Sequence, residues 1–589
     1  MSKRVTRQQD CATGAASAPT IAPAAASQGF RNISTGQPAS CDTEVSLARD
    51  GDSLVVRARC HCDAAGVSAH DRLVISFDPV GREADILSLQ VAPDGTIASS
   101  VLGTAFPENA SPAWGARAYP FPAVATTALT HDGWQAELRL PLAAMFAPRG
   151  GAVPASFRLN IGRNWDNRQW SYWPLANATF GEFVPGFARV QLSATSDQLS
   201  VTSDQLSVTS SHSPAAGTAA ACHSPLAPLD FVGLMYDTSR TGKIYDVATF
   251  IKFVDWLAVC GCTHFMLYFE NGFRFAKHPA FAAPAALDAA GVRQIDAACR
   301  ERGLELILAQ TSFGHMPGIL SHPDYIKLAE DGDPWQLCPS HPETYSFLGD
   351  LLDELIPLSS SRYFNVNCDE SRVLGLCPRC RGRGATALGK EQIFLDHLLW
   401  LHAKVTSHGK RMMVWGDHLL HMPAILDQLP KDIVVLDWQY CNWATFPSLS
   451  YLKDRGFETI GCPFNRYDNI RPMTLDCRRR SLAGVLDTIW EMGDGGLGLA
   501  APGIYLMGRL AQGDPSVSDE TLLAECEELI WPGNAPGIAW KMLIDHNGSL
   551  SPKLREKLKA DTARALRRAV PAPRFAWIAE HMRRFMENI

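Results

Sequence analysis

The sequence predicts a multidomain protein in which an N-terminal antiparallel β-sandwich precedes a (β/α)8 TIM barrel with C-terminal helices. Two observations support this fold class: short alternating runs fill residues 41–192, and eight apolar runs separated by helical stretches follow residue 229. A polar segment in which TSDQLSV occurs twice in tandem separates the two regions. The length of 589 residues and the hydrophobic content of 46% suffice for at least two cores.

The expected domain boundaries follow changes in composition. Residues 1–35 are rich in Ala, Pro and Ser and lack a compact apolar run, so we expect a disordered tail rather than a signal peptide. Residues 36–193 form the predicted sandwich. Residues 194–228 are a low-complexity linker, because they bury too little apolar area to offset the entropy of ordering. The barrel then spans 229–516, and a helical segment spans 517–589.

The N-terminal runs alternate apolar and polar residues and are separated by Gly, Pro and Asp turns, which is typical of antiparallel sheets with one buried face. They read SLVVRARC, DRLVISFDP, WQAELRLPL, FRLNIGRNW and FARVQL. Together with WSYWPL and FGEF, these runs resemble family 9 carbohydrate-binding modules and the related DOMON-like sandwiches. The resemblance implies that Trp165, Trp170, Tyr172 and Trp173 stack on a sugar ring, with packing in the sandwich core as the alternative for each.

Eight strand-like runs with amphipathic helical segments between them predict repeated βα units. The runs are FVGLMY (231–236), HFMLYFE (264–270), LELILAQ (304–310), YFNVNCD (363–369), RMMVWG (411–416), IVVLDW (433–438), FETIGC (457–462) and GVLDTIW (484–490). A doubly wound open sheet gives a similar alternation, but a count of eight favours closure into a barrel. The final segment, with acids and bases at short helical spacing, predicts helices on the barrel flank or at a dimer contact.

Polar and aromatic residues gather where these strands end, which is where such barrels hold their active sites. Core packing does not require this asymmetry, but a pocket for a polyhydroxylated ring does. The residues are Asp237, Arg240, Tyr268, Glu270, Asn271, Gln310, His315, Asp369, Glu370, Trp415, Asp417, Asp437, Trp438, Tyr440, Asn465, Trp490 and Glu491.

Charge, apolar run length and cysteine content bear on the partners and the location that we expect for the protein. The formal net charge of -7 and the lack of a long basic run argue against nucleic acid as a partner. No segment offers 18 apolar residues without charges, so we expect no membrane span. The 16 cysteines are few for this length and predict reduced thiols, which makes a cytoplasmic location the default.

Cys377 and Cys380 form a CxxC motif in GLCPRCRGRG. Such a pair is half of a tetrahedral zinc site, and Cys338, His341 or Cys441 could complete it. None of these provides a second close pair, so the sequence favours a reduced loop pair, and no metal or cofactor is expected.

Four motifs in the barrel region resemble glycoside hydrolase family 20, the β-N-acetylhexosaminidases. They are YFNVNCDES, SFGHMPGIL, MMVWGD and TIWE. The resemblance implies an exo-acting enzyme that releases terminal β-linked N-acetylhexosamine with retention from an oligosaccharide or glycoconjugate. The 2-acetamido group of the substrate would act as the nucleophile and form an oxazolinium intermediate. Glu370 would be the general acid and base, and Asp369 would orient the acetamide.

The resemblance also implies weaker assignments. Trp415, Trp438 and Trp490 would wall the site, and Tyr440 would donate to the acetamide carbonyl. Arg240, Asp417 and Glu491 would bind hydroxyls, and His315 would support the acid pair. Glu270 is a further candidate for substrate binding.

Two departures from the family pattern suggest a divergent relative. Asn367 and Cys368 stand where the family has two glycines, and a sandwich replaces the usual small α/β domain. GlcNAc and GalNAc both remain open as the released sugar. Two alternatives also remain open: a glycosidase of a non-acetamido sugar with Glu270 or Glu491 as nucleophile, and an inactive carbohydrate-binding or sensing protein.

Overall fold

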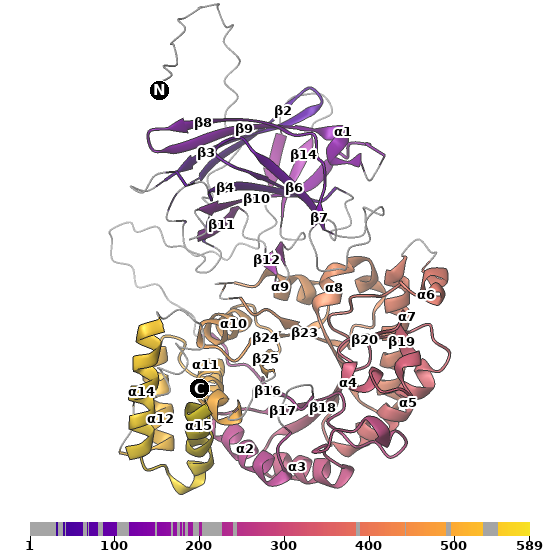
Figure 1. Ribbon diagram of the computed structural model, residues 1–589, viewed down its shortest axis with the longest axis vertical. Helices are drawn as coiled ribbons and strands as arrows, with labels where there is room; N and C mark the ends of the chain where they lie inside the picture. Colours follow the sequence, from indigo (N-terminus) through magenta and orange to yellow (C-terminus); the bar gives the residue numbers. More distant parts are fainter. Residues whose placement is uncertain are drawn as a thin grey trace, which may run out of the picture.

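The structure is a computed structural model that describes three main stretches of the chain (Figure 1). The first is 31–202, without 33–38, 40, 42, 63–66, 69, 80–85, 103–116, 148–149, 166–168, 174–176, 179–180, 183–186 and 193–198. The second is 226–533, without 240–243, 385–388, 442, 444 and 491–495; the third is 552–588, and residue 537 is also described.

The N-terminal region contains antiparallel sheets, as its alternating runs predict. One sheet has four strands in the order β2-β3-β9-β8, and a larger one follows the path β1-β11-β10-β4-β5-β6-β7, with β14 added beside β10. The bounds are β1 Arg31–Asn32, β2 Thr43–Asp50, β3 Ser53–His61, β4 Arg72–Phe77, β5 Ile86–Val91, β6 Ile97–Leu102, β7 Arg117–Ala118, β8 Val124–Thr130, β9 Gly133–Pro141, α1 Leu142–Met145, β10 Ser156–Trp165, β11 Gln169–Trp173, β12 Asn177–Ala178, β13 Gly181–Glu182 and β14 Ala188–Leu192. The five quoted runs correspond to β3, β4, β9, β10 and β14.

Alternate residues of both sheets contribute to one buried cluster. Val56 and Leu138 come from the four-stranded sheet, and Ile75 and Leu89 come from the larger one; all four side chains are fully buried. The period of two along each strand therefore gives each sheet its apolar face, as expected for half-buried strands.

A buried ion pair lies within the larger sheet, between Arg163 of β10 and Asp71 just before β4, and a tryptophan of the four-stranded sheet bonds to it. Arg163 of β10 donates from Nε and Nη2 to the two carboxylate oxygens of Asp71, at 3.0 and 2.7 Å, and both side chains are fully buried. Trp134 of β9 donates its indole N–H to the same carboxylate at 2.9 Å. A buried charge needs such pairing, because removal of either partner leaves the other charge uncompensated.

One short segment of the predicted low-complexity linker forms a β-strand, which composition did not predict. Residues Leu199–Thr202, within the tandem repeat, form β15 and pair antiparallel with β14. The repeat carries Leu, Val and Thr, which suit a strand, and the open edge of β14 supplies backbone partners that composition alone does not reveal.

The barrel prediction is confirmed: eight parallel strands close in the order β16-β17-β18-β21-β22-β23-β24-β25. Their bounds are β16 Phe231–Asp237, β17 His264–Phe269, β18 Glu305–Gln310, β21 Tyr363–Asn365, β22 Arg411–Trp415, β23 Val434–Trp438, β24 Glu458–Cys462 and β25 Gly484–Ile489. Each strand coincides with one of the eight apolar runs. Pairing of β16 with β25 closes the barrel.

Helices surround these strands, as Figure 1 shows. The longer ones are α2 Val247–Val259, α3 Ala289–Glu301, α5 Thr344–Leu355, α7 Lys390–Ser407, α9 Pro447–Asp454, α10 Tyr467–Arg479 and α11 Gly496–Gln512; the shorter ones are α4 Pro317–Leu320, α6 Pro378–Arg383 and α8 Asp417–His421. Asp246 and Asp288 begin α2 and α3 by accepting bonds from Thr249 N and Gly291 N. A hairpin of β19 (Ala329–Glu330) and β20 (Asp333–Leu337) is inserted between β18 and β21.

The C-terminal helices α12 (Asp519–Ile530), α14 (Pro552–Arg568) and α15 (Ala576–Asn588) confirm the predicted helical segment. Aromatic contacts join this segment to α2: the ring of Phe575 lies 5.1 Å from Trp256, and Trp577 of α15 lies 6.1 Å from Phe253. Of the two expected roles, packing on the barrel flank is therefore present.

No helix within the described stretches has both the length and the apolar character that crossing a membrane requires.

Candidate active site

The two predicted acids follow directly on the carboxyl end of β21. That strand ends at Asn365, earlier than the run YFNVNCD suggests. The reason lies in the backbone, since Asn367, Cys368 and Glu370 have φ of 62°, 69° and 48°. Left-handed residues break the extended geometry of a strand, so the chain turns sharply and presents Asp369 and Glu370 at the mouth of the barrel.

The same geometry explains the departure at Asn367 and Cys368. Left-handed φ is the conformation that glycine adopts without cost, whereas a residue with a Cβ pays roughly 1–2 kcal/mol. Asn is the better tolerated of the two, and its side chain is fixed: Oδ1 accepts bonds from Asn365 Nδ2 at 3.0 Å and Trp415 Nε1 at 2.9 Å. The buried Cys368 thiol lies 3.2 Å from the hydroxyl of Ser312. These contacts supply support that glycines would lack.

His315 lies between the two acids. Its Nε2 lies 3.2 Å from Asp369 Oδ2 and 3.1 Å from Glu370 Oε2, so one ring nitrogen can serve both carboxylates. The side chain of Asp369 is 6% exposed and that of Glu370 is 23% exposed. Glu370 is therefore the more accessible of the two acids.

Gly314 brings His315 against the acids. A Cβ at Gly314 would lie 2.2 Å from the backbone carbonyl oxygen of Asp369, which is too close for any side chain. His315 itself has φ of 57°. The loop after β18 therefore folds directly onto the acid dipeptide, which explains why SFGHMPGIL and YFNVNCDES meet in space.

Asp417, expected to bind sugar hydroxyls, bonds to the backbone of Glu370, the candidate general acid. Its Oδ2 accepts the N–H of Glu370 at 2.9 Å, and the side chain is buried. Burial, followed by the charge of Asp369, raises the pKa of Asp417 to about 8. Asp417 is therefore mostly protonated at neutral pH, which limits the negative charge gathered around the acids.

A neutral histidine holds the next residue along. His418 Nε2 accepts the N–H of Ser371 at 2.7 Å, and burial lowers the pKa of His418 to about 3. An uncharged ring can accept this bond, whereas a protonated ring could not. Two neighbouring side chains of α8 thus hold the backbone N–H groups of Glu370 and Ser371.

The predicted aromatic residues come together inside the barrel. Trp415, Trp438, Tyr440 and Trp490 belong to one cluster of buried and partly buried side chains. The rings of Trp415 and Trp490 are 5.8 Å apart, and those of Trp438 and Tyr440 are 4.9 Å apart. Tyr268, also named at a strand end, lies edge-on to Trp490 at 5.1 Å.

The hydroxyl of Tyr440 is oriented by two neighbours. It accepts from Trp490 Nε1 at 2.6 Å and lies 3.1 Å from Thr488 Oγ1, which also bonds to the Pro463 carbonyl oxygen at 2.8 Å. Burial raises the pKa of Tyr440 well above its usual value, which keeps the phenol neutral. This is the state that a donor to an amide carbonyl requires.

One predicted residue has another role in the structure, and two cannot be placed. Glu270 is fully buried, and its Oε1 accepts the N–H of Gly318 at 2.5 Å, so it anchors α4. Arg240 and Glu491 lie outside the described residues. The side chains of Trp165, Trp170, Tyr172 and Trp173 also lie outside the described set, and sugar binding by the N-terminal sheets stays a prediction.

The sequence interpretation missed two residues beside the acids, Trp335 and Arg372. Trp335 of β20 donates its indole N–H to the backbone carbonyl of Glu370 at 2.9 Å, and its ring lies 4.3 Å from His315. Arg372 stacks over Trp335 at 4.3 Å and lies 3.5 Å from Glu370 Oε2. Arg372 directly follows the acids in the stretch DESR, so its position in the sequence could have identified it as a candidate site residue. Trp335 enters from an inserted hairpin that strand counting does not detect.

Comparison with known proteins relates part of the barrel to one family. Residues 305–481 match the family "Glycosyl hydrolase family 20, catalytic domain", a segment that runs from β18 through α10 and contains both acids. This part of the barrel is similar to a glycoside hydrolase catalytic domain.

Two curated relatives match in part. The chain is 28% identical over 166 residues to a beta-hexosaminidase of Vibrio furnissii, covering 25% of this chain and 26% of the relative. It is 27% identical over 150 residues to a lacto-N-biosidase of Bifidobacterium bifidum, covering 23% of this chain and 13% of the relative. The chain thus spans about a quarter or less of either relative. A solved chitobiase of Flavobacterium johnsoniae is 19% identical, with a TM-score of 0.45 over 56% of this chain and 54% of that one.

Proposed function

We propose that the protein is an exo-acting glycoside hydrolase that releases terminal β-linked N-acetylhexosamine with retention, and that the 2-acetamido group of the substrate is the nucleophile. The observation that carries the proposal is the adjacent acid pair, Asp369 and Glu370, sharing His315 Nε2 at 3.2 and 3.1 Å. Adjacent acids cannot stand on opposite faces of a sugar, as a two-carboxylate mechanism demands. They can reach two points on the same sugar residue, the glycosidic oxygen and the acetamide group.

In the first step, Glu370 gives its proton to the glycosidic oxygen as the bond to the anomeric carbon breaks. The acetamide carbonyl oxygen attacks that carbon and forms a cyclic oxazolinium. Asp369 accepts a hydrogen bond from the acetamide N–H and stabilises the positive charge that develops there. Tyr440, a neutral phenol, donates to the carbonyl oxygen and holds it in line for attack.

In the second step, the Glu370 carboxylate takes a proton from water, and the water oxygen attacks the anomeric carbon. The oxazolinium ring opens and restores the acetamide, so the product keeps the β configuration. The greater exposure of the Glu370 side chain, 23% against 6% for Asp369, suits a group that meets both leaving group and water.

The two alternatives lack comparable support. Glu270 as a nucleophile for a non-acetamido sugar would have to leave its bond to Gly318 and its fully buried position. An inactive binding protein would have no need of two intact acids, fixed by His315 and by the Asp417 bond to the Glu370 backbone.

A panel of 4-nitrophenyl β-glycosides tests the substrate class. The purified protein should hydrolyse the GlcNAc or the GalNAc glycoside. It should act on the matching glucoside or galactoside at least ~10³-fold more slowly, because these sugars lack the internal nucleophile. Release of 4-nitrophenol is measured by absorbance, and proton NMR should show the β anomer of the sugar first. Failure to turn over either acetamido epimer would refute the proposal.

A further inference from the structure

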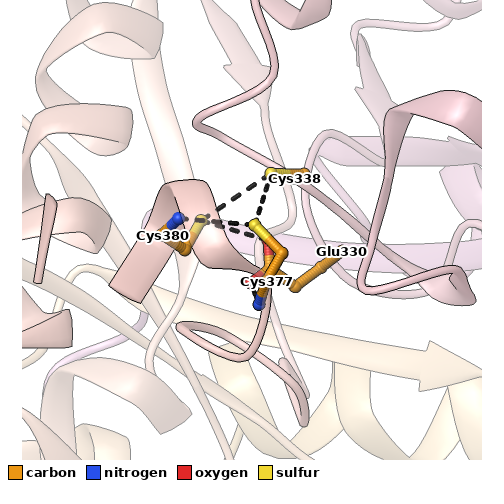
Figure 2. A group of neighbouring side chains, drawn as sticks. All are labelled: Glu330, Cys338, Cys377 and Cys380. Atoms are coloured by element: carbon orange, nitrogen blue, oxygen red, sulfur yellow. Dashed lines mark hydrogen bonds between the residues drawn. The ribbon is translucent and has the colours of Figure 1, made fainter. Parts of the chain in front are cut away.

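A second cluster of chemically active side chains lies outside the acid pair. Glu330 of β19, Cys338 just after β20, and Cys377 and Cys380 at the start of α6 place one ligand atom each within 4.8 Å of one another. Figure 2 shows the four side chains turned toward a common centre. All four residues are buried, at 5% exposure or less.

The sulfur separations match a tetrahedral metal site. Cys338 Sγ lies 3.6 Å from Cys377 Sγ and 3.7 Å from Cys380 Sγ. A zinc–sulfur bond of about 2.3 Å in a tetrahedron requires sulfur atoms ~3.8 Å apart. A disulfide requires about 2.05 Å, far shorter than either separation. The arrangement thus fits thiolates around a cation, not an oxidised pair.

Backbone N–H groups donate to two of the four ligand atoms. The Cys380 N–H donates to Cys377 Sγ at 3.3 Å, and the Cys377 N–H donates to Glu330 Oε1 at 2.9 Å. The other carboxylate oxygen, Oε2, lies 3.1 Å from Cys380 Sγ. Such contacts orient ligands and are typical of the surroundings of metal sites.

We propose that Glu330, Cys338, Cys377 and Cys380 bind one Zn²⁺ as a closed structural site. Zinc binding displaces the three thiol protons, and the carboxylate supplies the fourth ligand. The site then carries more negative than positive charge. Arg383 lies beside it, where it donates to Ser340 Oγ at 3.2 Å and to the Pro339 carbonyl at 3.0 Å and also pairs with Asp396 at 2.8 Å. With four protein ligands, the metal has no open position for chemistry.

The third cysteine revises the sequence interpretation of the CxxC pair. Cys338 was one possible partner, but its distance of 39 residues from Cys377 gives no recognisable spacing. The inserted β19–β20 hairpin brings it, and Glu330, to the pair. His341 and Cys441 are not in the cluster.

The position of the site gives the metal a further consequence, which rests on the proposed function. The same hairpin carries Trp335, bonded to the Glu370 carbonyl, and Gln336, whose Oε1 accepts from Ser371 Oγ at 2.7 Å and Val373 N at 2.9 Å. Zinc would fasten this hairpin to the segment that follows the acids. It would thereby act as a positioning element for Glu370.

Metal content of the full-length protein tests the proposal. Protein purified without an immobilised-metal column should contain about one zinc ion per chain, as measured by inductively coupled plasma mass spectrometry. Cys338→Ser should contain well below one. The matched control is Cys299→Ser, which removes a buried thiol from α3 outside the cluster and should keep its zinc. Chelator should lower the unfolding temperature of the wild type and of Cys299→Ser, and it should have little effect on Cys338→Ser.

Further measurements keep the test decisive. If Cys338→Ser does not fold, Glu330→Gln retains the side-chain shape and should bind zinc at least ~10-fold more weakly in a competition with a chromogenic chelator. Absence of zinc from the wild type, even after growth and purification with added zinc, would overturn the proposal. A disulfide from Cys338 to Cys377 or Cys380 in the native protein would also overturn it. Zinc loss without a change in hydrolysis would refute only the positioning role, independently of the enzymatic proposal.

Discussion

Glu370→Gln should lower kcat/KM for substrates with poor leaving groups, such as unmodified oligosaccharides, by about 10²–10⁴. The amide cannot give a proton to the glycosidic oxygen and cannot take one from water. The loss should be smaller for a 4-nitrophenyl glycoside, because that leaving group departs without full protonation. Initial rates on both substrate types measure the difference.

The control for this variant is Glu343→Gln, which alters a carboxylate that is 57% exposed and pairs with Lys327 on the surface. It should keep wild-type rates on both substrates. Wild-type hydrolysis of a natural oligosaccharide by Glu370→Gln would show that another residue is the general acid.

Asp369→Asn should reduce kcat by about 10²–10³, because a neutral amide stabilises the charge on the acetamide nitrogen less well than a carboxylate does. The folded protein should be at least as stable as the wild type. Asp369 is nearly buried, and a neutral amide avoids the cost of keeping a charged carboxylate away from water. In steady-state assays kcat should therefore fall, while the thermal unfolding temperature should stay the same or rise.

This divergence separates a catalytic role from a structural one. If Asp369→Asn lost activity and stability together, Asp369 would be holding the loop instead of the substrate. If it kept the wild-type rate on the acetamido substrate, the assignment of Asp369 would be wrong.

The barrel and the acid pair could be predicted because local chemistry encodes them. A strand buried on both faces is apolar throughout, and the polar residue that follows it marks the carboxyl end. Trp415, Trp438, Tyr440 and Trp490 could be named in this way without any knowledge of their mutual contacts. Each is fixed by its own strand, and closure of the barrel brings them together.

The other features of the site depend on contacts between segments that are distant in the sequence. The spacing of apolar residues within one strand or helix gives no information about such contacts. Asp417 reads as a pocket acid, yet its partner is a backbone N–H 47 residues away. The roles of Trp335 and Cys338 follow from an insertion that breaks the βα rhythm. The left-handed backbone of Asn367 and Cys368 could not be predicted from these residue types, because neither is glycine. The structure shows that both occupy positions where glycine would be unstrained, which fits the glycines of the family pattern.

The most direct test of the central claim is the response of the wild-type rate to fluorination of the substrate's N-acetyl group. Fluorine withdraws electrons from the carbonyl oxygen and weakens it as a nucleophile. Along the series from acetyl to trifluoroacetyl 4-nitrophenyl glycosides, kcat/KM should fall stepwise by at least about 100-fold, or ~2.7 kcal/mol of barrier. A rate that does not depend on fluorination would mean that the protein supplies the nucleophile, and it would contradict the account.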